Sequence, residues 1–290
     1  MKKIALLSGW PGYEKEVAKR SAQFFKTNLE EPFDYYELPE QLDEFLKNKD
    51  SYKLAIPVFH WEYGEDGKIF GFLEVLWIPY TFSPFDVHSL CMNKFRTNAI
   101  LSLIWIQVAS QYLFDGDDKK YKDFPYIVKP NHGGSSFYTH KIQNREELEK
   151  AVQDIKNNTT DEILIQQFIT WEEYSVPLVN GETLPIMKVE KKDSWAVFDY
   201  TSKYEDESSM KETFPNIEAW LKERLESSSK RIFDFFWCRW VARIDYIVQD
   251  GIPYFLEVNT IPGMTAVSIL PRAWSLTWKT SQELIKEIIK

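Results

Sequence analysis

Short apolar runs alternate with stretches of helical spacing at the start of the chain, and together they predict a small α/β domain. We expect residues 1–82 to form this domain around a mostly parallel sheet. Ligands bind at the carboxyl ends of such strands, where the loops at 8–14 and 60–67 lie. The predicted elements are strands at residues 2–8 and 54–59 and helices at residues 14–27 and 70–77.

Two further regions follow, one beginning near residue 83 and one from about residue 171. The first contains strands around a Gly/Ser loop together with helices, and the second ends in a hairpin and a final helix. These elements are predicted as helices at 92–109, 145–156, 217–227 and from 281 onward, strands at 126–130, 137–142 and 162–169, and a hairpin over 242–259.

The hairpin carries the sharpest chemical signal in the chain. We expect a three-residue loop that pairs Val248 with Ile252. Alternation then puts the polar side chains of both strands on the same side of the hairpin. That side would carry Arg243, Asp245 and Ile247 from the first strand and Phe255, Glu257 and Asn259 from the second.

Two carboxylates and a carboxamide on one sheet face indicate a divalent cation. Neighbouring like charges destabilise a sheet unless something neutralises them. The oxygen donors of Asp245, Glu257 and Asn259 suit Mg²⁺ that holds phosphates. The alternative is a structural ion pair between Asp245 and Arg243, with Glu257 on a solvated edge.

Two lysines are candidates for phosphate contacts. Lys129 points from a predicted strand that leads into the small-residue loop at 131–136, whose free N–H groups can cover phosphates. A plain hairpin turn explains this loop equally well, and it matches neither a P-loop nor a dinucleotide fingerprint. Lys94 stands at a helix start, where a solvated lysine is the ordinary case.

Three other residues gain interest from their positions. Gly263 follows the metal-type ligands in a Pro-Gly turn, so its N–H can approach a reacting centre. His60 follows a buried strand, where either a ligand contact or a turn-capping role fits. Glu173 is by default a surface acid. The chain has no HExxH and no GxSxG, which argues against hydrolases of those classes.

Composition narrows the range of partners. The 290 residues suggest about two domains, and 44 acidic against 35 basic residues give a net charge of −9. This sign disfavours nucleic acid and anionic membranes. Cys91 and Cys238 offer neither a disulfide framework nor a zinc site, so we expect a reduced cytoplasm. We expect neither a signal peptide nor a membrane segment.

Taken together, the motifs resemble the D-alanine–D-alanine ligases of the ATP-grasp superfamily. Their order and rough spacing agree over essentially the whole chain, and the C-terminal LEVNTIPGMT segment is the most specific match. The matching residues are Glu14, His60 with the GEDG at 64–67, Lys94, Lys129, the loop at 133–136, Glu173, Lys203, Tyr204, the ARID at 242–245 and the segment at 256–265.

The resemblance implies an ATP-grasp fold preceded by a pre-ATP-grasp domain, with domains at 1–82, 83–170 and 171–290. Two α+β lobes would clamp ATP together with two Mg²⁺ ions, or Mn²⁺. In this arrangement Lys94 and Lys129 would bind phosphates, Gln166, Gln167, Ile169 and Leu256 the adenine region, Glu173 the ribose, and Asp245, Glu257 and Asn259 the metal.

The resemblance also implies the roles of the remaining site residues. Arg243 and the Gly263 N–H would stabilise the tetrahedral oxyanion, and His60 would contact substrate. Glu14 would receive the ammonium group of the first D-alanine, Ser268 and Lys203 the carboxylate of the second, and Ser135 and Tyr204 would link with Glu14 to close the loop.

The product would be D-alanyl-D-alanine for peptidoglycan precursors, made by a cytoplasmic homodimer without nucleic-acid or membrane partners. The alternatives are a ligase for a different amino-acid or hydroxy-acid acceptor, or a nucleotide-binding homologue without catalysis. The chain departs from the family at three places. Trp61 replaces the glycine that follows the loop histidine, Gln166 replaces an expected glutamate, and Phe137-Tyr138 replace a Val-Gly-like pair.

Overall fold

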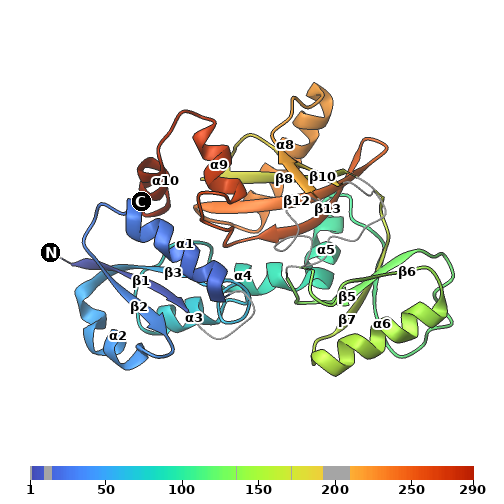
Figure 1. Cartoon of the computed structure of the whole chain (residues 1–290), viewed down its shortest axis with the longest axis horizontal. Helices are drawn as coiled ribbons and strands as arrows, with labels where there is room; N and C mark the ends of the chain where they lie inside the picture. The colour runs from blue at the N-terminus through green and yellow to red at the C-terminus, as the bar shows by residue number, and fades with distance from the viewer. Residues whose placement is uncertain (1, 10–14, 135, 171, 192–209) are drawn as a thin grey trace.

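The computed structural model describes residues 2–9, 15–134, 136–170, 172–191 and 210–290 (Figure 1). The strands are β1 (Lys3–Gly9), β2 (Phe33–Leu38), β3 (Tyr52–Val58), β4 (Gln111–Leu113), β5 (Tyr126–Pro130), β6 (His140–Ile142), β7 (Ile163–Gln167), β8 (Glu172–Val179), β9 (Glu182–Thr183), β10 (Met187–Lys191), β11 (Met210–Thr213), β12 (Val241–Gln249) and β13 (Ile252–Asn259). The helices are α1 (Lys15–Asn28), α2 (Leu42–Asn48), α3 (Lys68–Val75), α4 (Phe85–Met92), α5 (Lys94–Leu103), α6 (Arg145–Asn158), α8 (Ala219–Phe235), α9 (Ile269–Ser275) and α10 (Ser281–Ile288), with a 3₁₀ turn η1 at Lys49–Ser51.

The N-terminal part is the α/β unit that the sequence predicts. Within the described residues its sheet has three parallel strands in the order β2-β1-β3. The central strand β1 is buried from Ile4 onward, because helices α1, α2 and α3 pack around the sheet (Figure 1). The carboxyl ends of β1 and β3 point toward the middle of the molecule, and the chain after β3 continues into the loop that carries His60.

The helix predicted over residues 92–109 is present but shorter. It is α5, which begins at Lys94 and ends at Leu103, and a separate helix, α4, ends just before it at Met92. Asn93 Oδ1 accepts a hydrogen bond from Arg96 N at 2.9 Å, so this side chain caps a new helix. Helix α5 stops at Leu103, two residues before Trp105 takes up a left-handed backbone conformation with φ of 63°.

A second sheet forms the central lobe, drawn in green in Figure 1. Its four described strands are antiparallel in the order β4-β7-β5-β6, and helix α6 packs on β5 and β6. The predicted strand at 126–130 is confirmed, whereas the partner predicted at 137–142 is the shorter strand β6. This lobe has its own apolar core, which includes Val128, Leu148 and Ile165.

The third sheet carries the predicted hairpin, but with a different register. Gln249 pairs with Ile252, so the loop has two residues, Asp250 and Gly251, both with positive φ as a tight hairpin turn requires. A bulge at Leu256 then shifts the pairing. Phe255 lies opposite Tyr246 and is buried in the core, so the prediction that it shares a face with Glu257 is wrong.

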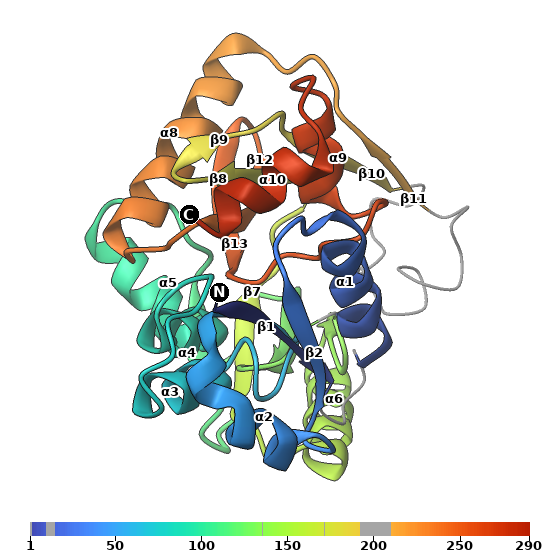
Figure 2. The same cartoon turned by 90° about the vertical axis from the view of Figure 1, so that its left-hand side faces the viewer.

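Apolar cores connect segments that are distant in the sequence. One core joins the N-terminal strands with helices α9 and α10, and α10 lies against α1 (Figures 1 and 2). A second core covers one face of the hairpin sheet and packs against α4, α5 and α8. Among the described residues, no helix combines the length and the apolar character needed to cross a bilayer.

The buried His88 makes the stability of this fold depend on pH. Its Nδ1 lies 2.6 Å from Thr260 Oγ1, its ring stacks on Phe70, and burial lowers its pKa to about 3. Below about pH 6.5 this histidine becomes protonated in the unfolded chain but stays neutral in the folded one. The free energy of unfolding therefore decreases as the pH falls. We predict that His88→Phe reduces the slope of unfolding free energy against pH, between about pH 6 and 4, by about 1.4 kcal/mol per pH unit.

Denaturant melts at several pH values test this prediction. His140 is the matched control, because it is partly exposed and bonded to Asp154 rather than enclosed in a core. Equal slopes for His88→Phe and the unmodified chain would show that His88 is not the responsible group.

Candidate active site

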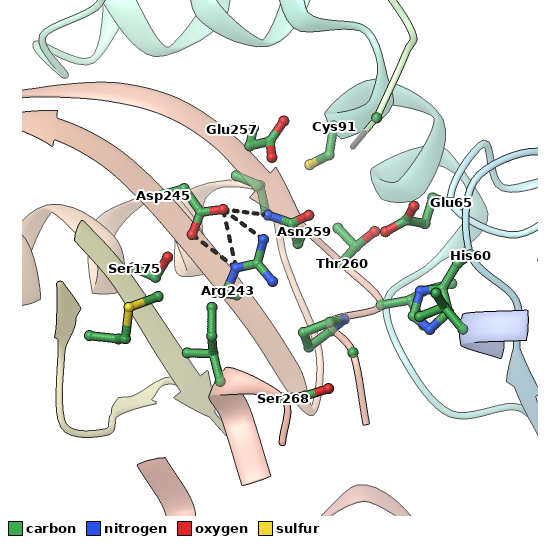
Figure 3. Close-up of a pocket in the computed structure, with 18 of the residues that line it drawn as sticks. His60, Glu65, Cys91, Ser175, Arg243, Asp245, Glu257, Asn259, Thr260 and Ser268 are labelled. Atoms are coloured by element: carbon green, nitrogen blue, oxygen red, sulfur yellow. Dashed lines mark hydrogen bonds and ion pairs between the residues drawn. The ribbon is translucent and has the colours of Figure 1, made fainter. Parts of the chain in front are cut away.

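A cavity of about 480 Å³ lies where the N-terminal unit, the central lobe and the hairpin sheet meet. Figure 3 shows polar side chains from several elements around this cavity. It brings together nine residues that the sequence singles out: His60, Lys94, Glu173, Arg243, Asp245, Glu257, Asn259, Gly263 and Ser268.

The centre of the cavity is the polar face of strands β12 and β13. Asp245 lies opposite Glu257 and Arg243 opposite Asn259, so all four side chains share one side of the hairpin. Arg243 Nε and Nη2 donate to the Asp245 carboxylate at 2.8–3.1 Å, and Asn259 Nδ2 donates to Asp245 Oδ2 at 2.9 Å (Figure 3). Burial alone lowers the pKa of Arg243, but the Asp245 carboxylate more than compensates and raises it.

The alternative interpretation of this hairpin, a structural ion pair with Glu257 on a solvated edge, agrees with the structure only in its first part. The ion pair between Arg243 and Asp245 exists. Glu257, however, does not sit on a solvated edge: it lines the cavity, and its carboxylate lies 4.0 Å from Lys94 Nζ. The polar face thus combines a neutralised carboxylate with a second carboxylate that faces a lysine.

The donor set on this face fits a hard divalent cation. Asp245 and Glu257 supply carboxylate oxygens from directly opposed positions, and Asn259 keeps its amide oxygen while its NH₂ group bonds to Asp245. In the described part of the chain, no group of three or more His, Cys, Asp or Glu side chains is arranged to hold a metal ion. A cation here would depend on two carboxylates and one carboxamide.

The two candidate lysines occupy different environments. Lys94 lines the cavity and its ammonium group donates to the Gly133 carbonyl, which ties α5 to the Gly/Ser loop. Lys129 is 8% exposed and is not among the residues that line the cavity. Burial, followed by the nearby charge of Lys94, lowers its pKa to about 8, against the opposing effect of Glu257.

His132 anchors the start of the Gly/Ser loop. Its backbone N–H and its Nδ1 lie 2.7 Å from the two carboxylate oxygens of Asp161, and its Nε2 lies 2.9 Å from Asn93 Nδ2. Asn93 caps α5, so the loop and the helix that carries Lys94 are linked by side chains as well as by backbone. Gly133 and Gly134 then line the cavity.

His60 borders the opposite wall of the cavity. Its Nε2 lies 3.1 Å from Ser21 Oγ, which also accepts a hydrogen bond from Met264 N at 3.2 Å. Burial, with a smaller effect of the Arg243 charge, lowers the pKa of His60 to about 4. His60 is therefore neutral at physiological pH, and Ser21 joins the loop that carries it to the turn after β13.

The turn after β13 is closely packed around Gly263. A Cβ at this position would lie 2.9 Å from Ser268 Oγ, so a larger residue does not fit without displacing Ser268. Ser268 Oγ accepts a hydrogen bond from Thr265 N at 3.1 Å and lies 2.7 Å from Thr265 Oγ1. The predicted pair of Gly263 and Ser268 is thus brought together at one edge of the cavity.

Not all predicted ATP contacts line this cavity. Gln166 is buried in β7 and pairs with Gln111 and Ile127, and Gln167 is exposed at the end of that strand. Ile169 follows β7, and Leu256 occupies the bulge of β13. These four residues, together with Lys129, remain outside the lining, whereas Glu173 lies within it.

Comparison with known proteins decides the family. The family model for the D-ala D-ala ligase C-terminus matches residues 111–290. D-alanine–D-alanine ligase A of Bacillus cereus is 32% identical over 97% of this chain and 95% of its own length. The chain belongs to the D-alanine–D-alanine ligase family. A ligase of Clostridium beijerinckii is 30% identical over 99% of this chain and 97% of its own length.

Solved structures of the D-alanine–D-alanine ligase family agree with the fold. The Bacillus anthracis ligase complexed with ATP superposes with a TM-score of 0.85 at 28% identity, covering 100% of this chain and 96% of that one. The D-Ala:D-Ser ligase VanG of Enterococcus faecalis has a TM-score of 0.82 at 24% identity, covering 99% and 98%, and shares the fold. The predicted combination of a parallel N-terminal sheet with an ATP-grasp architecture is confirmed.

Four residues expected from the D-alanine–D-alanine ligase resemblance lie outside the described residues. They are Glu14, Ser135, Lys203 and Tyr204.

Sequence reasoning assigned no individual role to several residues that line or support the site of this family member. Glu65, Cys91 and Thr260 line the cavity, and Cys91 lies beside Cys238, which together with burial raises its pKa. The role of Ser21 could not be predicted, because a small residue on the buried face of a helix is ordinary. Its only sequence signal was a hydroxyl among the apolar positions of α1.

Ser21 is expected to stabilise the junction between His60 and the turn after β13. Ser21→Ala leaves the buried Met264 N–H without its acceptor, which costs about 1–3 kcal/mol. Chemical denaturation measures this loss. Ser102→Ala is the control, because Ser102 is exposed and bonds only its own helix, so its effect stays within about 0.5 kcal/mol. Equal stabilities of the two variants would contradict the assignment.

Proposed function

We propose that this chain is an ATP-dependent ligase that joins two D-alanines into D-alanyl-D-alanine for peptidoglycan precursors, with release of ADP and phosphate. The observation that supports this proposal most strongly is the arrangement of Arg243, Asp245, Glu257 and Asn259 on one cavity wall, with Lys94 close to Glu257. Relatives that are 30–33% identical over nearly their full length carry this enzyme name.

The proposed reaction begins between two anions. A D-alanine carboxylate oxygen attacks the γ-phosphorus of ATP and displaces ADP, which forms D-alanyl phosphate. Lys94 and Lys129 would reduce the repulsion between these anions, because both ammonium groups lie near the polar face and the Gly/Ser loop. The ATP complex of the Bacillus anthracis relative supports ATP as the nucleotide.

Asp245, Glu257 and Asn259 would hold Mg²⁺ in the proposed enzyme. The cation would supply positive charge to the phosphate oxygens. The residues themselves prepare the site: Arg243 fixes the orientation of the Asp245 carboxylate, and Asn259 fixes it from the other strand. These two contacts hold the carboxylate in one orientation on the wall.

The second proposed step joins the amino acids. The amine of the second D-alanine attacks the carbonyl carbon of D-alanyl phosphate, and phosphate leaves after the amine has lost a proton. Arg243 and the Gly263 N–H would stabilise the tetrahedral oxyanion. Neutral His60 would contact substrate, and Ser268 would bind the carboxylate of the second D-alanine at the edge of the cavity.

The identity of the acceptor is the part of the proposal that needs the most direct test. The alternatives are another amino acid or a hydroxy acid.

A homodimer in the cytoplasm belongs to the same proposal, and the two buried free cysteines, Cys91 and Cys238, agree with a reducing compartment.

Glu257 is expected to be essential for turnover. With ATP, Mg²⁺ and D-alanine the purified chain should form dipeptide and phosphate, and Glu257→Gln should lower phosphate release about 100-fold or more, because a carboxylate on the phosphate-facing wall is lost. Coupled phosphate assays and chromatography of the dipeptide measure both products. Glu223→Gln, on the exposed side of α8, is the control and should leave the rate unchanged.

The assay can also refute the proposal. No phosphate and no dipeptide from the unmodified chain would favour a nucleotide-binding homologue without catalysis. Faster turnover with another member of a panel of D- and L-amino acids and D-lactate would identify a different acceptor.

Lys129 predicts a pH dependence of nucleotide binding. Its pKa of about 8 means that it loses its proton as pH rises through that value, and the neutral amine attracts phosphate less. We expect ATP affinity, measured by calorimetry, to fall several-fold between about pH 7.5 and 9. Lys129→Arg should remove most of this fall, because arginine stays protonated. An unchanged pH profile in Lys129→Arg would exclude Lys129 as the titrating group.

A further inference from the structure

Most of the tryptophans that the structure describes have an unusual backbone conformation. Eight of its tryptophans lie among the described residues, and six of them have a left-handed φ between 55° and 67°. Only a few per cent of non-glycine residues adopt this conformation, mainly Asn, Asp and His, because a Cβ there crowds the backbone. The six are Trp61, Trp77, Trp105, Trp237, Trp240 and Trp278.

Three of these tryptophans end helices in the way that glycine usually does. After α3, the Trp77 N–H bonds to Glu74 O at 3.0 Å and the Ile78 N–H bonds to Leu73 O at 3.0 Å. This pair of bonds is the Schellman motif, whose left-handed C′ residue is usually glycine. The same two bonds recur at Trp105 after α5 and at Trp237 after α8.

The contacts of these side chains do little to offset the unfavourable backbone conformation. Trp77, Trp105, Trp237 and Trp278 are 79–98% exposed, so their indoles gain almost no burial. Trp240 is partly buried, and its indole N–H is a buried donor without an acceptor among the described residues. Loss of the side chain would relieve the four exposed positions, and at Trp240 it would remove the unpaired donor together with an indole that packs against the N-terminal core.

Trp61 connects this pattern with the cavity. The bonds that shape its loop use only its backbone: its N–H donates to Glu65 Oε2 at 2.9 Å, and its carbonyl accepts from Glu65 N at 2.9 Å. The indole stacks on Phe137, with ring centroids 6.3 Å apart. A glycine keeps both loop bonds and removes the stack, and glycine is also the residue that the family resemblance places after the loop histidine.

We infer that the functional protein carries glycine at these six positions. The codon UGA is read as tryptophan in some genetic codes and as glycine in others, so one reassigned codon accounts for all six. The composition agrees, because 11 glycines in 290 residues are about half of the roughly 20 that average usage gives. The inference does not depend on the proposed ligase activity.

Trp274 is the internal counter-example. It is buried within α9, its indole N–H donates to Thr280 O at 2.8 Å, and Lys279 lies over its ring at 4.5 Å. Here the indole is enclosed and its polar atom is satisfied, as expected for a true tryptophan. The inference therefore distinguishes positions within one chain by their backbone and their packing.

The direct experiment is peptide mass spectrometry of the protein isolated from its source cells, together with sequencing of the gene. We expect glycine and UGA at the six positions, and tryptophan and UGG at position 274. Tryptophan in the peptides that cover the six positions, or UGG codons there, would overturn the inference.

Stability of the recombinant chain gives a second readout. Each Trp→Gly change at Trp77, Trp105 and Trp237 should raise the melting temperature by about 2 °C or more, because the left-handed strain disappears. Trp274→Gly is the control and should lower it. If the unmodified chain does not fold and the sixfold glycine variant does, the inference is supported; lower melting temperatures in all three exposed variants would contradict it.

Discussion

Two carboxylates held opposite each other on neighbouring strands determine how the rest of the cavity must be built. Asp245 and Glu257 would repel each other across the hairpin if both faced an apolar sheet. Two positive side chains offset this repulsion: Arg243 pairs with Asp245, and Lys94 lies near Glu257. The net charge of the whole chain is negative, yet these two positive groups both lie at this one wall of the cavity.

The position of Glu257 depends in turn on the β-bulge at Leu256. Without the extra residue, strand alternation would place Phe255 on the side of Asp245 and would move the carboxylates out of register. With it, Phe255 enters the apolar core on the opposite face. A packing requirement of the core and a chemical requirement of the cavity are thus met by the same irregularity.

Part of the site could be predicted from the sequence. The polar face of the hairpin follows from the alternation of two short strands, and Gly263 from the Pro-Gly turn after them, whereas Lys94 gained its role only from the resemblance to the ligase family. Ser21 was not predictable, because its role arises from contacts with His60 and Met264, which are distant in the sequence. The burial of Lys129 was not predictable either, because it depends on packing between lobes.

The errors at helix ends have a common physical origin. The predicted helix over 92–109 ran past Leu103 because the left-handed residue that stops it is Trp105, and tryptophan gives no stop signal. The helix predicted to residue 77 includes Trp77 for the same reason. Glycine at these two positions would have marked both ends, so the residues that mislead the sequence analysis are those whose backbone is most constrained.

The division of the apolar cores has a structural consequence. One continuous core ties the N-terminal strands to α9 and α10, so the first and last segments of the chain share one packed unit. The central sheet keeps a core of its own, which includes Leu148 and Ile155. The central lobe therefore contacts α5 through polar groups, such as Asn93 with His132 and Lys94 with Gly133, on the side where it borders the cavity.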